Sequence, residues 1–132
     1  MHRRAVAVAA VAILVPAAFA GAASAQEDSV RIRMTEFAFR MPDNLDAGRT
    51  RITFRNAGEF QHNFTVVSAL GGGRAFRSAT IEGGRTQSKT VSLRPGAYVA
   101  VCTVFNGGHL AQGMHTTFTV GEFDQESGEW GP

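Results

Sequence analysis

Apolar and polar residues alternate along several short stretches of this chain, the pattern of β-strands that bury one face. The clearest stretches are residues 30–34 and 51–55, in which hydrophobic residues at every second position are separated by arginine or threonine. A period of two continues through Phe37, Phe39 and Met41. Further strands are predicted over residues 62–67, 89–93, 97–102 and 116–120.

Turn-forming residues separate these stretches, notably at 42–44, 56–58 and 94–96. About seven to eight short strands with such spacing predict an all-β protein, a Greek-key β-sandwich. The longest interruption is residues 70–87, which contains two runs of glycine. We expect a loop there, with one short helical turn near residues 74–78.

Residues 1–25 have the composition of an export signal. Basic residues at positions 2–4 precede an apolar, alanine-rich stretch, and Ala23-Ser24-Ala25 fits a cleavage site. We expect cleavage after Ala25, by either the general or the twin-arginine route, and a periplasmic or secreted protein. An uncleaved anchor is the alternative, because residues 5–25 are just long enough to span a bilayer. No second stretch of that length follows, so we expect no stable membrane insertion.

The remaining chain is predicted to be one domain, residues 26–121, followed by an acidic tail, residues 122–132. The tail carries four acids, no base and one tryptophan, and we expect it to be disordered. Without Arg3 and Arg4, the chain has eleven basic and eleven acidic residues. Because this balance is neutral and the sequence shows no basic stripe, we do not expect nucleic acid as a partner. We also expect a monomer.

The chain has a single cysteine, Cys102, with two potential metal ligands close behind it. His109 and Met114 follow within thirteen residues, and His62 lies forty residues earlier. An unpaired cysteine in an exported protein indicates either an intermolecular bridge or a thiol with a special role. One thiolate, two imidazoles and a thioether select copper, with His62, Cys102 and His109 in a plane and Met114 as a weak axial ligand. We therefore predict one type 1 copper ion.

Strand pleating predicts where these side chains lie. Cys102 is the last core-facing residue of one predicted strand, and Met114 is the first core-facing residue of the next. His62 lies at the rim of the same core. Residues 103–113 should then form a loop at one end of the sandwich, with His62 reaching the site from across the sheets. His115 should point away from the core.

Three segments resemble motifs of the cupredoxins, the blue-copper family that includes plastocyanin, azurin and rusticyanin. The resemblance implies a Greek-key sandwich, the same four copper ligands, and copper that cycles between Cu(I) and Cu(II). It also implies that Asn63, directly after the first histidine, helps to hold the cysteine-bearing loop. Six residues separate Cys102 from His109, more than in many blue-copper proteins. The motifs are N-A-G-E-F-Q-H-N-F (56–64), G-A-Y-V-A-V-C (96–102) and G-H-L-A-Q-G-M (108–114).

A one-electron carrier is the function that this site favours. Redox proteins are expected to dock near His109, where Phe105, Leu110 and Ala111 form an apolar patch unless Phe105 is buried beneath the loop. The alternative function is copper handling in the periplasm, as a chaperone or by sequestration. We do not expect an enzyme, because only His115 remains for a second copper centre and Met114 would crowd the open position of a catalytic zinc.

Overall fold

The computed structural model describes residues 28–132, so the predicted export signal lies outside the described residues. These residues form strands almost throughout, with one short helix. The elements are β1 (Asp28–Thr35), β2 (Ala38–Arg40), β3 (Asn44–Leu45), β4 (Gly48–Asn56), β5 (Thr65–Ser68), β6 (Arg74–Arg77), β7 (Thr86–Leu93), β8 (Gly96–Val101), α1 (Val104–Ala111), β9 (His115–Val120), β10 (Glu122–Asp124) and β11 (Glu129–Gly131).

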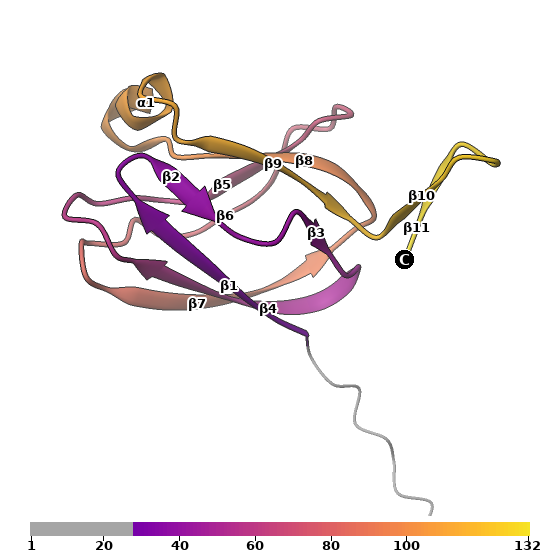
Figure 1. The fold of residues 1–132 in the computed structure, drawn as a ribbon, viewed down its shortest axis with the longest axis horizontal. Coiled ribbons are helices and arrows are strands. Elements are labelled where there is room, and N and C mark those ends of the chain that lie inside the picture. Colours follow the sequence, from indigo (N-terminus) through magenta and orange to yellow (C-terminus); the bar gives the residue numbers. More distant parts are fainter. Residues whose placement is uncertain (1–27) are drawn as a thin grey trace, which may run out of the picture.

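Nine of the strands form two sheets that pack face to face, which confirms the predicted β-sandwich. One sheet has the order β2-β1-β4-β7 and the other β3-β9-β8-β5-β6. The chain crosses between the sheets repeatedly, so that β1 pairs in parallel with β4 and β3 in parallel with β9. Helix α1 lies at one end of the sandwich and the β10–β11 hairpin at the other (Figure 1).

The alternation of residue types places the core where the sequence predicted it. In β1, Ile32 and Met34 are buried while Arg31 and Arg33 are exposed. Phe64 lies at the centre, with its ring 5.0 Å from that of Phe39 in one sheet and 6.4 Å from that of Phe118 in the other. Burying such a side chain stabilises the fold by about 1.5–3 kcal/mol.

Two expectations about local structure were wrong. Residues 74–77, expected to include a helical turn, form the edge strand β6, and Phe76 packs its ring 6.0 Å from Phe64. The tail, expected to be disordered, forms the β10–β11 hairpin, in which Phe123 pairs with Trp130 across the strands. Backbone N–H groups of Glu126 and Ser127 donate to the Asp124 carboxylate and stabilise the turn. Aromatic pairing and this turn outweigh the repulsion between the acids.

Strand register gathers arginines on the outer face of the four-stranded sheet. Arg33 is directly opposite Arg40 on β2 and Arg55 on β4, so three guanidinium groups lie in one row across the sheet. This concentration contradicts the expectation that the chain has no basic stripe, because the period of two sends every arginine of these strands outward. We call this surface the arginine face; its residues are Arg31, Arg33, Arg40, Arg49, Arg51 and Arg55, all exposed.

Helix α1 occupies part of the segment expected to be a loop, and it is irregular. Phe105 and Asn106 have φ angles of 53°, and Gly107 has a φ of 82°, so the chain makes a left-handed turn before the last helical turn. Such angles are unstrained only for Gly107. Among residues 28–132, no helix is long and apolar enough to cross a bilayer.

Candidate metal centre

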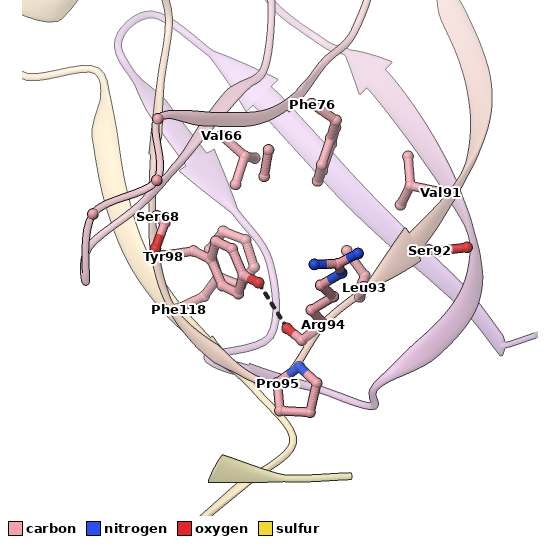
Figure 2. A pocket seen from close by; sticks show the side chains of 14 residues that line it. Val66, Ser68, Phe76, Val91, Ser92, Leu93, Arg94, Pro95, Tyr98 and Phe118 are labelled. Atoms are coloured by element: carbon pink, nitrogen blue, oxygen red, sulfur yellow. Dashed lines mark hydrogen bonds between the residues drawn. The ribbon is translucent and has the colours of Figure 1, made fainter. Parts of the chain in front are cut away.

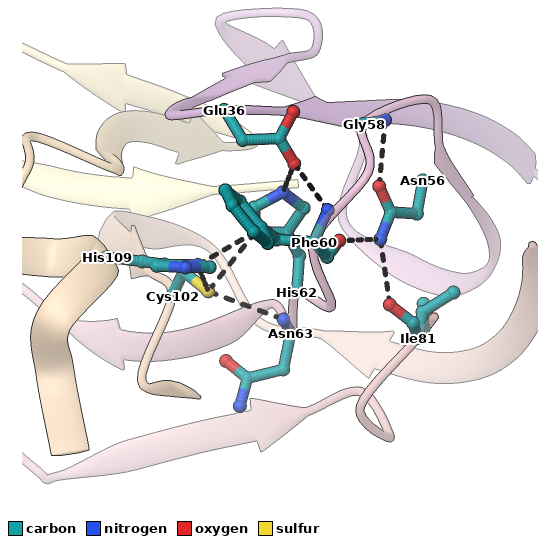
Figure 3. A network of polar contacts seen from close by, with 9 residues as sticks. All are labelled: Glu36, Asn56, Gly58, Phe60, His62, Asn63, Ile81, Cys102 and His109. Atoms are coloured by element: carbon teal, nitrogen blue, oxygen red, sulfur yellow. Dashed lines mark hydrogen bonds and ion pairs between the residues drawn. The ribbon is translucent and has the colours of Figure 1, made fainter. Parts of the chain in front are cut away.

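Three of the predicted ligands meet at the end of the sandwich that carries α1. The donor atoms of His62, Cys102 and His109 lie within 4.8 Å of one another (Figure 3). The two Nδ1 atoms are 3.0 Å apart, and the sulfur of Cys102 is 3.8 Å from Nδ1 of His62 and 3.6 Å from Nδ1 of His109. His62 and Cys102 are fully buried, and His109 is 6% exposed.

Cys102 and His62 are positioned by the same sheet, and His109 lies in α1, which connects β8 to β9 of that sheet. Cys102 directly follows β8 and His62 lies three residues before β5, the strand that pairs with β8. The expectation that His62 reaches the site from across the sheets was therefore wrong. His62 is held by a single backbone bridge to Ile81, with hydrogen bonds of 3.0 and 2.8 Å between their peptide groups.

Met114 is tied to the same group through its backbone. Its carbonyl accepts a hydrogen bond of 3.1 Å from the N–H of Cys102, and its own N–H donates 3.0 Å to the carbonyl of His109. The Met114 side chain is fully buried. His115, the next residue, is exposed, as the pleating of the strand predicted.

Asn63 connects the segment before β5 to the segment after Cys102. Its side-chain oxygen accepts from the backbone N–H of Thr103 at 2.9 Å, and its side-chain amide donates to the Thr103 hydroxyl at 2.9 Å. Its backbone N–H points at the sulfur of Cys102, 3.5 Å away.

Sequence reasoning missed a fourth polar residue at this site, Glu36. Its Oε1 atom lies 2.9 Å from Nε2 of His62 and accepts a second bond of 2.9 Å from the backbone N–H of Phe60 (Figure 3). Burial alone would raise the pKa of Glu36, but the hydrogen bonds from Phe60, His62 and Glu59 outweigh it and lower the pKa below its ordinary value. The sequence signal that could have indicated this role is that Glu36 is a single acid between the apolar residues of β1 and Phe37.

Asn56, a buried residue, holds the loop that places Phe60 beside His109. The side-chain amide of Asn56 donates to the carbonyls of Phe60 and Ile81, at 2.7 and 2.8 Å, and its oxygen accepts from the N–H of Gly58. Asn56 is fully buried, so leaving these groups unpaired would cost about 1–3 kcal/mol each. Through Ile81 this network reaches the backbone of His62.

Aromatic rings surround His109. The rings of Phe37 and Phe105 each lie 5.0 Å from its imidazole, and that of Phe60 lies 6.1 Å away. Phe105 is 57% exposed, which excludes burial beneath the loop; Phe60 is 54% exposed and Leu110 38%. Burial lowers the pKa of His109 from its ordinary value, and the nearby His62 lowers it further, against an opposing effect of Glu36. A neutral imidazole is the form that binds metals.

The arrangement fits a metal ion bound by three ligands in a plane. Nitrogen and sulfur donors that lie about 2.0–2.3 Å from a metal in such a plane are about 3.5–3.8 Å from one another. The two nitrogen–sulfur distances match this geometry, and the nitrogen–nitrogen distance is slightly shorter. The donor set, two imidazoles and one thiol, is the set that suits copper.

A cavity in the described part of the chain lies away from these residues. It has a volume of about 640 Å³ and lies between the sheets near the β5–β6 and β7–β8 loops. The hydroxyl of Tyr98 lies at this cavity and donates to the carbonyl of Arg94 at 2.7 Å (Figure 2). None of the candidate ligands lines it. The metal centre is thus a buried cluster and not an open pocket.

Comparison of the structure with solved structures confirms the predicted cupredoxin fold. Auracyanin from Roseiflexus castenholzii matches with a TM-score of 0.60 at 21% identity, over 73% of this chain and 98% of its own. Auracyanin A, a blue copper protein from Chloroflexus aurantiacus, matches at 0.59 and 22%, over 72% and 99%. Rusticyanin from Thiobacillus ferrooxidans matches at 0.55 and 16%, over 72% and 79%. No family model and no curated protein matches the sequence.

Proposed function

We propose that this chain is an exported type 1 copper protein that carries one electron at a time. The observation that supports the proposal best is the buried group of His62, Cys102 and His109, whose donor atoms lie within 4.8 Å of one another on a sandwich with the cupredoxin fold. Bound copper would supply the redox couple Cu(II)/Cu(I). The chain supplies a rigid, dry set of donors.

Rigidity is the main contribution of the protein to such a function. Cys102 is held by one backbone hydrogen bond to Met114, and the adjoining Thr103 is held by Asn63. A donor set that keeps its geometry in both oxidation states makes electron transfer fast, because little has to rearrange. Met114 would add a weak sulfur ligand, since its side chain is buried and the residue directly precedes β9 at the same end of the sandwich.

Electrons would enter and leave beside His109. Phe60, Phe105 and Leu110 are exposed around it and form an apolar patch, together with the exposed Ala111. An apolar rim excludes water from a short-lived contact with a redox protein, and small interfaces suit rapid dissociation. The expectation of Phe105, Leu110 and Ala111 as docking residues is thus extended by Phe60, which sequence reasoning missed.

The decisive experiment is the visible spectrum of the copper-loaded, oxidised protein. We expect one copper per chain and an intense thiolate-to-copper charge-transfer band, which Cys102→Ser should abolish. A colourless Cu(II) complex, or a preference for zinc without a coloured copper form, would rule out this function. A blue protein that exchanges no electrons with redox proteins would instead be a copper-handling protein.

A further inference from the structure

We propose that Glu36 is a positioning residue for the metal centre, holding the imidazole of His62 so that its Nδ1 lone pair faces the metal. This inference rests on the proposed copper function. It differs from the ligand assignment because Glu36 donates nothing to the metal and acts entirely through His62.

The hydrogen-bond chemistry determines which nitrogen of His62 carries the proton. Oε1 of Glu36 already accepts from the backbone N–H of Phe60, and a carboxylate can only accept, so the Nε2 atom of His62, 2.9 Å from the same oxygen, must donate. In a neutral imidazole the Nδ1 atom is then unprotonated, and it faces Nδ1 of His109 and the sulfur of Cys102. Glu36 thus selects the tautomer that a metal requires.

The residues around Glu36 leave space for its carboxylate and donate a hydrogen bond to it. A Cβ atom on Gly58 would overlap the carboxylate oxygens, so this position accepts only glycine while the contact exists. The N–H of Phe60 donates to the same oxygen that binds His62, and Asn56 holds the turn between them. Glu36 follows β1, in the sheet that provides none of the candidate ligands.

A charged acceptor also changes the strength of the metal ligand. A carboxylate that accepts from the distant N–H of an imidazole makes the other nitrogen a stronger donor. A stronger donor stabilises Cu(II) relative to Cu(I), so Glu36 should lower the reduction potential. A neutral acceptor in its place would keep the ring orientation and lose this electronic effect.

Two substitutions separate orientation from charge. Glu36→Gln keeps an oxygen that accepts from Nε2, so it should retain copper and raise the reduction potential. Glu36→Leu removes the acceptor and should weaken copper binding by about 10–100-fold. Glu59→Gln, an exposed acid beside the same turn, is the matched control and should change neither quantity.

Nitrogen NMR of the metal-free protein provides a second readout. His62 should be a pure Nε2–H tautomer in the native chain and in Glu36→Gln, and a mixture in Glu36→Leu. An unchanged tautomer and an unchanged potential in both variants would overturn the role of Glu36. If the native protein forms no blue copper site but the tautomer still depends on Glu36, the copper function fails and the positioning role stands. If Glu36→Leu does not fold, Gly58→Ala, which displaces the carboxylate, takes its place.

We also infer that the arginine face docks on phospholipid membranes with negatively charged headgroups. Six exposed arginines share this face, and Arg33, Arg40 and Arg55 form one row across it. No acid occupies an outward position of β1, β2, β4 or β7; serine, threonine and Ala38 fill the others. Basic residues near a negatively charged bilayer are attracted to it, and the attraction grows with the number of such residues.

The composition of the face favours a membrane over a protein partner. Protein interfaces have an apolar centre, and the outward positions of these four strands contain no large apolar side chain. Guanidinium groups bind phosphate oxygens in pairs of hydrogen bonds, so a flat array of them suits a flat array of phosphates. The apolar patch around His109 is at the sandwich end and would remain accessible.

Sedimentation of the mature protein with phosphatidylglycerol vesicles tests this surface. We expect binding that high salt abolishes, and that vesicles of phosphatidylcholine alone do not support. A variant with glutamine at Arg31, Arg33, Arg40 and Arg51 should bind more than about tenfold less tightly. The control carries glutamine at Arg74, Arg77, Arg85 and Arg94, so its net charge is identical, and it should bind like the native protein. Equal losses in both variants, no binding by the native protein, or tighter binding to duplex DNA or an acidic protein would overturn the inference.

Discussion

Asn63 and Thr103 lie forty residues apart in the chain and are joined by a pair of side-chain hydrogen bonds beside Cys102. The side-chain amide of Asn63 both accepts from the Thr103 backbone and donates to its hydroxyl, so it fixes the chain directly after the buried thiol. This contact makes the segment before β5 and the start of α1 one rigid unit.

Replacing Asn63 by alanine should loosen this unit. The backbone N–H of Thr103 would lose its partner, and we expect a loss of about 1–3 kcal/mol in the free energy of unfolding. Copper should also dissociate faster, since the loop that carries Cys102 would move more freely. Thermal unfolding and copper transfer to a chelator measure the two effects. Asn44→Ala, which removes bonds to Thr119 and Gly121 elsewhere, should leave copper release unchanged.

Met114→Leu should keep copper and colour and raise the reduction potential. The axial bond in such sites is long and weak, and the loss of a sulfur donor disfavours the more electron-poor Cu(II). Leucine has a similar volume, so the buried position should stay packed. Potentiometry and the visible spectrum check the prediction. Complete loss of copper would make Met114 a primary ligand and favour a copper-sequestering role.

Leu110→Glu should slow electron exchange while the spectrum and potential stay nearly constant. Leu110 belongs to the exposed patch around His109, and a charge there would retain water between the partners. Self-exchange rates measured by NMR line broadening provide the test. Leu70→Glu makes the same change in the β5–β6 loop, away from α1, and should have little effect (Figure 1). Equal effects at the two positions would place the electron path elsewhere.

The metal-free protein should become less stable as the pH falls below about 6.5. Burial, with a contribution from His62, lowers the pKa of His109, so the unfolded chain takes up this proton at a higher pH than the folded chain. The stability linked to His109 is therefore fully present above the unfolded pKa and is lost as the pH decreases. Glu36, whose pKa is also lowered, acts in the same direction at more acidic pH. Unfolding midpoints at several pH values, compared with those of His109→Gln, measure the dependence; equal slopes would contradict it.

Most of the sandwich was predictable because its strands bury one face. The alternation of Ile32 and Met34 with arginines is unambiguous, and so is that of Ile52 and Phe54. Strand β6 was not predictable in this way, since three of its four residues are exposed and glycines precede it. Hairpin β10–β11 depends on the contact between Phe123 and Trp130 across its strands. The acidic composition of this segment predicted disorder instead.

The approach of His62, Cys102 and His109 was predictable from residue type and strand ends, and the structure brings the three together. Glu36 was not, because its role depends on a tight turn between β1 and β2 that carries it across to the other sheet. Phe60 was missed for the same reason: its place beside His109 follows from the loop held by Asn56. The arginine face required strand register, which net charge does not reveal.

The three donors share one sheet as their origin, so the two layers of the sandwich have different roles. His62, Cys102 and His109 all adjoin the sheet that contains β5, β8 and β9, so pairing of those strands alone brings the donors together. The opposite sheet is needed to bury them and to deliver Glu36 to His62. Under the proposed copper function, the donor set would thus be assembled by one layer of the sandwich and shielded from water by the other.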